Sequence, residues 1–367
     1  MKFNKLLLIP ILFGLASCEQ TINSASIPTS SSSNNDSTGT SSTILDDRPV
    51  LDFKVLSPKG APSVLYSSFM KKSLDKVTIA APNSIPAEFT KGEYGAIIFD
   101  ATKGANFAKK GTSKYKLASI LTTGNAYLVS LGTKDVNDTI SDDDVIVSFT
   151  KDAIFTKIFE KVHNVSIDHE VSDVSSALVV AKTGKVENTN VDYVILSEPM
   201  LTSLFVSYKN NDGTVLTKPT LKENITESWK KYSKEQGFNN NQGFNGFPQA
   251  GLFINVDLEN DETKKGSVQS FIDVIKNNAL DFETNNGNNV METVLNDVKN
   301  NLYPEDQFGV KANLLKQITN KETNINKINN ALAFNGKAYD FNAFLNEAVL
   351  EGFTAYPESI FSSFYIK

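Results

Sequence analysis

The chain has 367 residues, of which 40% are hydrophobic and 21% are charged, and its formal net charge is -6. This is the composition of a globular protein, and the length is sufficient for two lobes. The acidic balance argues against a nucleic-acid surface, which needs basic stripes to replace the counterions of the phosphates. Arg48 is the only arginine, so an anionic ligand has to be held by backbone amides, hydroxyl groups or lysine rather than by a guanidinium group.

The N-terminus has the pattern of a secretory signal. Lys2 and Lys5 precede an apolar run over residues 6–15, and Cys18 follows two small residues. The run is too short to span a bilayer as a stable helix. Its end resembles the bacterial lipobox, in which the cysteine is lipidated and becomes the new N-terminus; the alternative is an ordinary signal peptide with an incidental cysteine. Cys18 is the only cysteine, which leaves it without a disulfide partner in the chain. We therefore expect residues 1–17 to be a lipoprotein signal peptide and Cys18 to be lipidated.

The stretch after the cysteine is rich in serine, threonine and asparagine over residues 21–43. Such a composition buries too little apolar surface to offset the entropy of ordering. Residues 18–45 are therefore expected to be a disordered tether. It would hold the folded part at the outer face of the cell membrane.

From Val50 onwards, short apolar runs of strand character alternate with helical patterns. Runs of this kind are typical of strands that helices cover on both faces. The candidate strands are Phe53–Leu56, Val77–Ala81, Ala96–Phe99, Lys116–Thr123, Ala126–Leu131, Val145–Phe149, Val191–Leu196 and Gly251–Val256.

Two apolar stripes recur at i, i+3, i+4 and i+7, which predicts helices that pack on a sheet. The alternation of strands and helices favours an α/β fold with largely parallel sheets. After about residue 290 the pattern becomes helical. The stripes are Phe155, Ile158, Phe159, Val162 and Val268, Phe271, Ile272, Ile275, and the tail segments are Val310–Ile318 and Phe344–Val349.

Four junctions between a predicted strand and the following helix carry loop chemistry. In open α/β sheets, ligands bind beyond the carboxyl ends of strands, where unpaired N–H groups of helix starts hold polar or anionic groups. The alternative is that each junction is only a turn and a cap. The junctions follow Phe53–Leu56, Ala96–Phe99, Val145–Phe149 and Val191–Leu196.

Taken in order, the junctions resemble a known family. The stretches VLSPKGAPSVLY, YGAIIFDATKGANFAKKG, YKLASILTTGNAYLVS, VDYVILSEPMLTSLF and GFPQAGLFINVD span roughly residues 50–260. Their series is similar to the type II periplasmic-binding-protein fold, and within it to ABC-transporter binding proteins for nitrate, sulfonates, taurine and thiamine precursors. The helical tail carries no signature of its own.

The resemblance implies two α/β lobes joined by hinge strands, with a ligand in the cleft between them and a helical C-terminal tail. The first part of lobe I would comprise residues 46–125, and lobe II with the hinge strands residues 126–289. Residues 290–367 would return to lobe I. The chain would cross to lobe II near Thr123–Leu131.

Carried over position by position, the resemblance implies a set of ligand-binding residues from these loops. Asp100 and Glu198 favour a ligand with donor groups, such as an amine or aminopyrimidine, although each could instead be a cap or a hinge hydrogen-bonding partner. The set is Lys59, Gly60, Ala61, Pro62, Asp100, Ala101, Thr102, Thr123, Gly124, Asn125, Thr150, Lys151, Glu198, Pro199 and Gln249.

The sequence lacks the signatures of common catalytic and cofactor sites. It has no Gly-x-Ser-x-Gly elbow, no P-loop and no dinucleotide fingerprint. His163 and His169 are the only histidines, and their spacing does not place them on one helical face. We therefore expect no enzyme activity, cofactor or metal, and we expect the lone tryptophan, Trp229, to pack in the core.

Three functions are compatible with these observations. The favoured one is a monomeric solute-binding lipoprotein that delivers a small polar metabolite to the permease of an ABC importer. The second is a surface lipoprotein for adhesion or host interaction, although no repeats or long heptads support it. The third is an enzyme on the same two-lobed fold, which the signal peptide disfavours.

Overall fold

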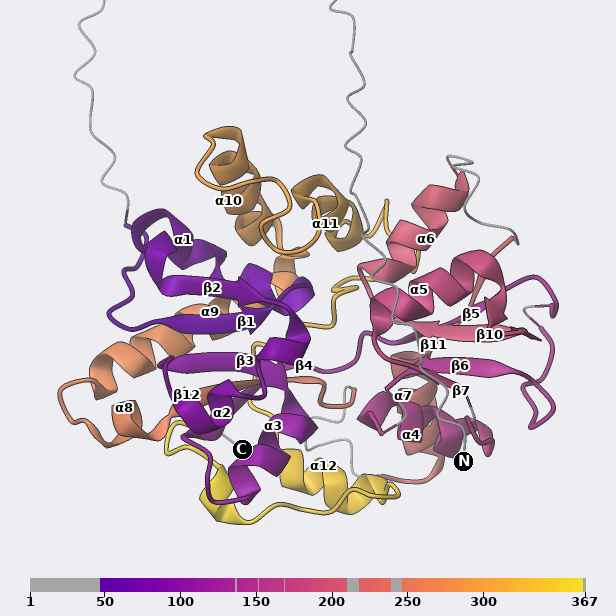
Figure 1. Ribbon diagram of the computed structural model, residues 1–367, viewed down its shortest axis with the longest axis horizontal. Coiled ribbons are helices and arrows are strands. Elements are labelled where there is room, and N and C mark those ends of the chain that lie inside the picture. Colours follow the sequence, from indigo (N-terminus) through magenta and orange to yellow (C-terminus); the bar gives the residue numbers. More distant parts are fainter. Residues whose placement is uncertain are drawn as a thin grey trace, which may run out of the picture. The chain divides into compact units, whose positions relative to one another are not determined.

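The computed structural model describes residues 47–135, 137–150, 152–167, 169–209, 218–238 and 246–365 (Figure 1). The expected signal peptide, the tether and Cys18 lie outside the described residues. Residues Asp47–Lys367 make one unit, which contains two five-stranded sheets. Within the described ranges, the helices are all too short or too polar to cross a membrane.

The first sheet has the strand order β2-β1-β3-β12-β4. The first three strands run parallel to one another, and β12 is antiparallel to both of its neighbours. Every residue of β12 is buried, since apolar clusters cover both faces of the sheet. The strands are β1 Val55–Pro58, β2 Val77–Ala80, β3 Ala96–Asp100, β4 Tyr115–Thr122 and β12 Ala250–Asn255.

The second sheet has the strand order β11-β5-β10-β6-β7. Its strand β5 is antiparallel to both neighbours, and the other inner pairs are parallel. A two-stranded hairpin, β8 Lys185–Val186 with β9 Thr189–Asn190, forms a separate small sheet. The main strands are β5 Tyr127–Ser130, β6 Ile146–Phe149, β7 His169–Val171, β10 Tyr193–Leu196 and β11 Thr220–Asn224.

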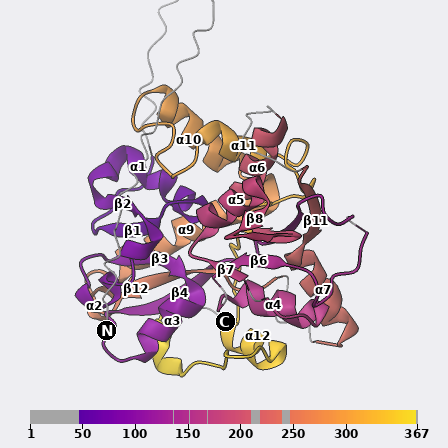
Figure 2. The same ribbon diagram turned by 45° about the vertical axis from the view of Figure 1, so that its right-hand side comes forward.

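Helices flank both sheets (Figures 1 and 2). Around the second sheet lie α4 Ile154–His163, α5 Val174–Thr183, α6 Met200–Lys209 and α7 Ile225–Glu235. The elements around the first sheet are the helical turn η1 Ala61–Tyr66 and the helices α1 Ser67–Ser73, α2 Glu88–Lys91, α3 Ala101–Lys109, α8 Val256–Asn260, α9 Lys265–Asn285 and α10 Asn288–Lys299. Of the C-terminal helices, α11 Ala312–Thr319 contacts α6, and α12 Phe341–Ala348 places Phe344 against Trp229 of α7. Phe334 and Phe361 of the tail also form isolated bridges with Thr122 and Leu117 of β4, so the C-terminal tail touches elements of both sheets.

The eight strands expected from the sequence are present, with their ends shifted by one or two residues. The short strands β7, β8, β9 and β11 were missed because they are polar and only partly buried or exposed. The expectation of largely parallel sheets needs a correction, since each sheet is mixed. A buried central strand has the same apolar pattern in either direction, so β5 and β12 gave no sign of being antiparallel.

The chain crosses from the first sheet to the second between Thr122, the end of β4, and Tyr127, the start of β5. The predicted crossing near Thr123–Leu131 overlaps this segment, and its role as a boundary between lobes stays a prediction. The return comes earlier than expected, because residues up to 289 were assigned to the second lobe. Instead, β12 lies in the first sheet, and Phe271 and Ile275 of α9 pack in the core on that sheet. An apolar strand or stripe does not reveal which of two sheets it joins.

Candidate ligand-binding pocket at the crossover

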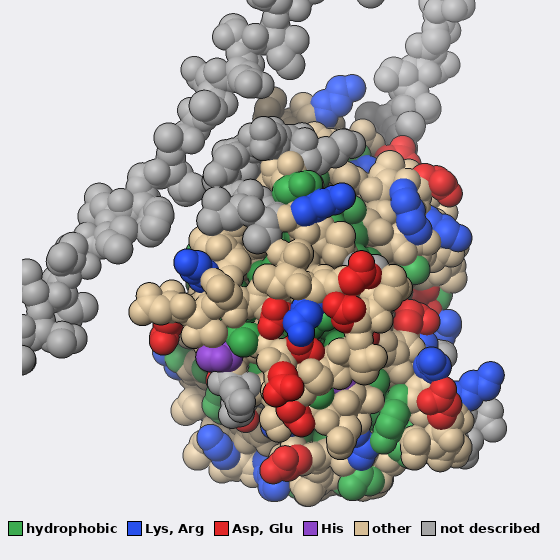
Figure 3. Space-filling model, turned by 90° about the vertical axis from the view of Figure 1, so that its right-hand side faces the viewer, with side chains coloured by type: hydrophobic (Ala, Val, Ile, Leu, Met, Phe, Trp, Pro, Cys, Tyr) green, Lys and Arg blue, Asp and Glu red, His purple; other side chains and the backbone are tan. Residues whose placement is uncertain are grey.

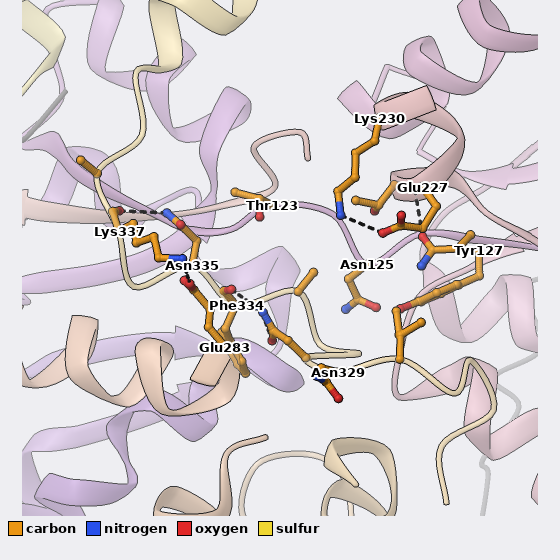
Figure 4. A pocket seen from close by; sticks show the side chains of 16 residues that line it. Thr123, Asn125, Tyr127, Glu227, Lys230, Glu283, Asn329, Phe334, Asn335 and Lys337 are labelled. Carbon is orange, nitrogen blue, oxygen red and sulfur yellow. Dashed lines mark hydrogen bonds and ion pairs between the residues drawn. The ribbon is translucent and has the colours of Figure 1, made fainter. Parts of the chain in front are cut away.

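A pocket of about 320 Å³ lies at the crossover from the first sheet to the second (Figure 4). We call it the crossover pocket. Its walls come from residues 123–127, which lead from β4 into β5 and which we call the crossing strand, from the start of α7, from the end of α9 and from the segment 328–338. The lining residues are Thr123, Asn125, Tyr127, Asn224, Thr226, Glu227, Lys230, Glu283, Ile328, Asn329, Asn330, Ala333, Phe334, Asn335, Lys337 and Ala338.

The crossing strand has a backbone conformation that its residues permit. Gly124 has φ 140° and Asn125 has φ 77°, a region that glycine and asparagine tolerate better than other residues. A Cβ on Gly124 would lie 2.2 Å from Oγ1 of Thr226, which belongs to the first turn of α7. Glycine is therefore needed for the close approach between the crossing strand and α7.

Asn125 joins the crossing strand to the loop after β10. Its Nδ2 donates to the carbonyl oxygen of Glu198 at 3.1 Å, and its Oδ1 accepts the N–H of Glu198 at 2.7 Å. The peptide bond between Glu198 and Pro199 is cis. The structure thus brings together Asn125 and Glu198, two residues that the sequence had assigned to different loops of one site.

The Glu198 carboxyl group is buried beside the start of α6 rather than exposed to the pocket. Only 2% of the residue is exposed. Its oxygens accept hydrogen bonds from the N–H of Thr202 at 3.0 Å and from Oγ1 of Thr202 at 2.8 Å. Burial raises the pKa of Glu198 to about 7, against the opposing effect of these hydrogen bonds. Glu198 thus caps the start of α6 through Thr202, and its direct contact with a ligand stays a prediction.

The charged side chains of the pocket form two internal ion pairs. Nζ of Lys230 lies 2.7 Å from Oε1 of Glu227, one turn earlier on α7. Nζ of Lys337 lies 2.7 Å from Oε2 of Glu283, and Oε1 of Glu283 accepts the N–H of Gly336 at 2.5 Å. Figure 4 shows the two pairs on opposite sides of the pocket. Two carboxylates and two ammonium groups cancel, so the lining carries no net charge.

Asparagine side chains supply most of the remaining polar lining. Nδ2 of Asn335 donates to the carbonyl oxygens of Ile120 and Lys337, at 2.9 and 3.0 Å, which leaves its Oδ1 without a partner among the described residues. Asn330 is bonded in both directions to the backbone of Phe334. These bonds fix the segment 328–338 in place and orient its amides.

The segment 328–338 is also held to the crossing strand. The N–H of Thr123 donates to the carbonyl of Ala333 at 2.8 Å, and the Tyr127 hydroxyl donates to the carbonyl of Ala331 at 2.7 Å. Thr123 follows the first sheet and Tyr127 begins the second. The segment therefore rests on both sides of the crossover.

The first predicted loop lies outside the pocket lining. The N–H of Lys59 donates to the carbonyl of Ala80, and the N–H of Gly60 donates to the carbonyl of Phe308, both at 2.8 Å. Gly60 has φ 122°, and Ala61 and Pro62 begin the helical turn η1. The loop has the expected turn chemistry, but these two amides are bonded within the chain.

The second predicted loop is also bonded within the chain. Oδ1 of Asp100 accepts hydrogen bonds from Oγ1 of Thr102 and from the N–H of Lys103, both at 2.8 Å, and so caps α3. The N–H of Ala101 donates to the carbonyl of Gln249 at 2.9 Å. Gln249 in turn connects this loop to β4, since its own N–H donates to the carbonyl of Thr122.

In the third loop, the N–H of Thr150 donates to the carbonyl of Val171 at 3.3 Å, and the residue has φ 76°. Lys151 lies outside the described residues. Of the predicted site residues, the described part of the chain places Thr123 and Asn125 in the lining of the crossover pocket. A ligand-binding role for the other residues stays a prediction.

Sequence reasoning missed most of the pocket lining. Residues 328–338 were read as part of a helical tail, although the segment INNALAFNGKA is rich in asparagine and contains a glycine. That composition is typical of a loop, and it was the available signal. Glu227 and Lys230 lie on α7 with exposed side chains, and no local pattern in the sequence marks them as part of a pocket.

The predictions for the tryptophan and the histidines can be compared with the structure. Trp229 is 1% exposed and packs against Tyr232, Phe238 and Phe344, which confirms its expected place in the core. Nε2 of His163 lies 2.9 Å from Oε1 of Glu223. In the described ranges, no group of three or more His, Cys, Asp or Glu residues is arranged to hold a metal ion.

The face that carries the second sheet shows acidic side chains and lysines interspersed, without a continuous basic surface (Figure 3).

Comparison with known proteins gives matches in structure but not in sequence. No protein-family model matches the chain, and no curated protein matches it. A ligand-binding component of an ABC-type import system from Staphylococcus aureus, solved with zinc bound, is 10% identical. It aligns over 86% of this chain and 96% of its own, with a TM-score of 0.52. A protein from Bordetella bronchiseptica RB50 is also 10% identical, covering 82% and 90%, with a TM-score of 0.52. An ABC transporter protein from Parabacteroides distasonis is 16% identical, covering 73% and 83%, with a TM-score of 0.48.

The chain has a periplasmic-binding-protein-like fold. In this fold the crossover pocket lies where the polypeptide passes from one sheet to the other. At 10% identity the likeness to the Staphylococcus aureus protein concerns the fold. The ligand has to be argued from the residues of the pocket itself.

Proposed function

We propose that the protein is an extracytoplasmic solute-binding lipoprotein. It captures a small polar metabolite at the crossover between its two lobes and delivers it to the permease of an ABC importer. The fold supports this proposal, as does the description of the Staphylococcus aureus structure as a ligand-binding component of an import system.

The observation that carries the proposal is the origin of the pocket walls. Glu227 and Lys230 come from α7, which follows the second sheet, whereas Glu283 comes from α9, which packs on the first. A solute in the pocket would contact both lobes at once. Contacts that improve when the lobes approach each other would shift the population towards a closed form, which is the state that a permease has to recognise.

The proposal places the protein at the outer face of the cell membrane. Lipidation of Cys18 would anchor it, and the tether over residues 18–45 would separate the lobes from the bilayer. The protein would act as a monomer, and it would be a binding protein without catalytic activity. The lobe division would follow the two sheets, with the first lobe resuming at β12.

A thermal-shift screen of the purified full chain tests the proposal. The panel contains monosaccharides and polyols, amino acids, nitrate and sulfonates, and pyrimidine and thiamine precursors. A ligand of the folded state should stabilise it by about 2.7 kcal/mol at a hundredfold excess over its dissociation constant. A saturable shift with one compound class, confirmed by calorimetric titration, supports solute binding. A flat response to every class contradicts it.

A further inference from the structure

We infer that the crossover pocket takes an uncharged, hydroxyl-rich solute of about monosaccharide size. The inference rests on the proposed function and names the ligand class of the same site. It departs from the anionic ligands of the binding-protein branch that the sequence resembles.

Two helix starts that would suit an anion are occupied by carboxylates of the chain. Asp100 accepts the N–H of Lys103 at the start of α3, and Glu198 accepts the N–H of Thr202 at the start of α6. Such donors, at the positive end of a helix dipole, suit an anionic ligand. Here they are occupied, and an anion beside the Asp100 carboxylate, or beside Glu198 when it is ionised, would meet repulsion instead.

The other donors suited to an anion are engaged as well. The N–H of Gly60 is bonded to the carbonyl of Phe308 at 2.8 Å. Nη1 of the single arginine, Arg48, donates to both carboxylate oxygens of Asp297, at 2.9 and 2.7 Å. The binding of an anion by amides or by a guanidinium group would require these internal bonds to break.

The lysines of the pocket are neutralised by their own partners. Lys230 is paired with Glu227, and Lys337 with Glu283, each at 2.7 Å. A singly charged ligand that approached one member of a pair would be repelled by the other member, which lies 2.7 Å from the first. An uncharged ligand leaves both pairs intact. Its hydroxyl groups can donate to the carboxylates and accept from the ammonium groups.

The neutral groups of the lining suit hydroxyls. A hydroxyl group both donates and accepts, which matches the carbonyl and NH₂ ends of asparagine, the threonine hydroxyl and the two kinds of charged group. Asn335 offers a carbonyl oxygen without a partner among the described residues, and Thr123 is partly exposed beside it in the lining. Figure 4 shows Thr123 between the two ion pairs.

The size and the aromatic residues of the pocket further restrict the class of ligand that it can bind. A volume of about 320 Å³ holds about ten waters at roughly 30 Å³ each, which is enough for a monosaccharide. The two aromatic rings of the lining belong to Tyr127 and Phe334, and each residue is only 1% exposed. Among the residues that the structure describes, the lining therefore offers no open ring on which a nucleobase could stack, which favours a polyol over a pyrimidine.

Titration calorimetry of the full chain with three groups of probes tests this inference. The uncharged group contains D-glucose, D-xylose and myo-inositol, the anionic group methanesulfonate and nitrate, and the zwitterionic group glycine and taurine. We expect saturable binding in the uncharged group alone, with a dissociation constant that added NaCl does not change. Binding confined to the anionic or zwitterionic group overturns the ligand class but leaves solute binding intact. Failure of all three groups overturns both.

A substitution at Thr123 tests whether the uncharged probe binds in the crossover pocket. Thr123→Val removes one hydroxyl group and keeps the shape of the side chain. It should weaken binding of the uncharged probe roughly tenfold, the loss of about one hydrogen bond. Thr112→Val is the matched control, since Thr112 is exposed and is not among the pocket residues. Equal affinity of Thr123→Val and wild type would place the binding elsewhere and overturn the inference.

Discussion

Asn125 holds the main chain of Glu198 by two hydrogen bonds, one to the carbonyl oxygen at 3.1 Å and one from the N–H at 2.7 Å. The two residues are 73 positions apart. The pair connects the crossing strand to the cis peptide bond before Pro199. This relationship gives Asn125 a structural role in addition to its place in the pocket lining.

Asn125→Ala should therefore destabilise the protein as well as change the pocket. The substitution leaves the N–H and the carbonyl of Glu198 without these partners, and Glu198 is 2% exposed. Alanine also tolerates the φ of 77° less well than asparagine does. We expect a loss of about 3 kcal/mol in the free energy of unfolding, measured by urea denaturation. An unchanged midpoint would show that these two bonds contribute nothing.

Glu198 should make stability depend on pH. Burial raises its pKa from 4.5 to about 7 in the folded state, so the folded protein holds a proton that the unfolded chain releases. Stability from this group is fully present below about pH 4.5 and is lost as the pH rises towards 7. The difference between these limits is about 3 kcal/mol.

Glu198→Gln isolates this contribution, because glutamine does not titrate. Unfolding free energies of the variant and the wild type are compared from pH 4.5 to 8. The free energy of unfolding of the wild type should fall relative to that of the variant as the pH rises from 4.5 to about 7. Above that pH the difference between the two should stay constant. Parallel curves throughout would mean that the folded-state pKa is not raised.

The sequence was informative where the pattern is local. The strand β3 and the stripe that contains Phe271 are apolar because both contact a core, and such runs are recognisable without any partner. The polar strand β11 was not predicted because all of its residues are only partly buried. The antiparallel direction of β12 could not be predicted because a strand buried on both faces has the same apolar pattern in either direction.

The site was harder to predict because it depends on distant contacts. The Gly60 amide was expected to face a ligand, but it donates to Phe308, almost 250 positions later in the chain. Thr123 and Asn125, which line the pocket, were among the residues that the family resemblance implied. The opposite wall, around Asn335, is brought there by the return of the C-terminal tail. No local pattern reveals that return.

Gly246→Ala should destabilise the protein strongly. A Cβ at this position would lie 1.9 Å from the carbonyl oxygen of Thr123, so the crossing strand would have to move. We expect a loss of about 3 kcal/mol, measured by denaturation, together with weaker binding of the ligand. The matched control is Gly266→Ala in α9, where no atom lies within 4 Å of the added Cβ. Alanine there should stabilise the protein by about 0.5–1 kcal/mol, and equal effects of the two substitutions would contradict the close approach.

Arg48→Ala should also destabilise the protein, since it breaks the ion pair with Asp297. The two N–O distances are 2.9 and 2.7 Å, and Asp297 is 4% exposed. The substitution leaves a buried carboxylate with the Tyr303 hydroxyl at 3.5 Å as its remaining described contact of this kind. Removal of one member of a buried pair typically costs about 3 kcal/mol or more. Urea denaturation at low and high salt measures the loss, which should change little with salt because Asp297 is buried and only 22% of the Arg48 side chain is exposed.

The double variant Arg48→Leu with Asp297→Leu distinguishes two quantities: the net contribution of the ion pair to the free energy of unfolding, and the cost of leaving one charge buried without its partner. Replacement of both groups by apolar side chains removes the buried carboxylate, so much of the stability should return. Ligand binding should be unchanged in the double variant, since neither residue lines the crossover pocket. If methanesulfonate bound the wild type and not the double variant, Arg48 would be a ligand contact, and its assignment to the ion pair alone would be wrong.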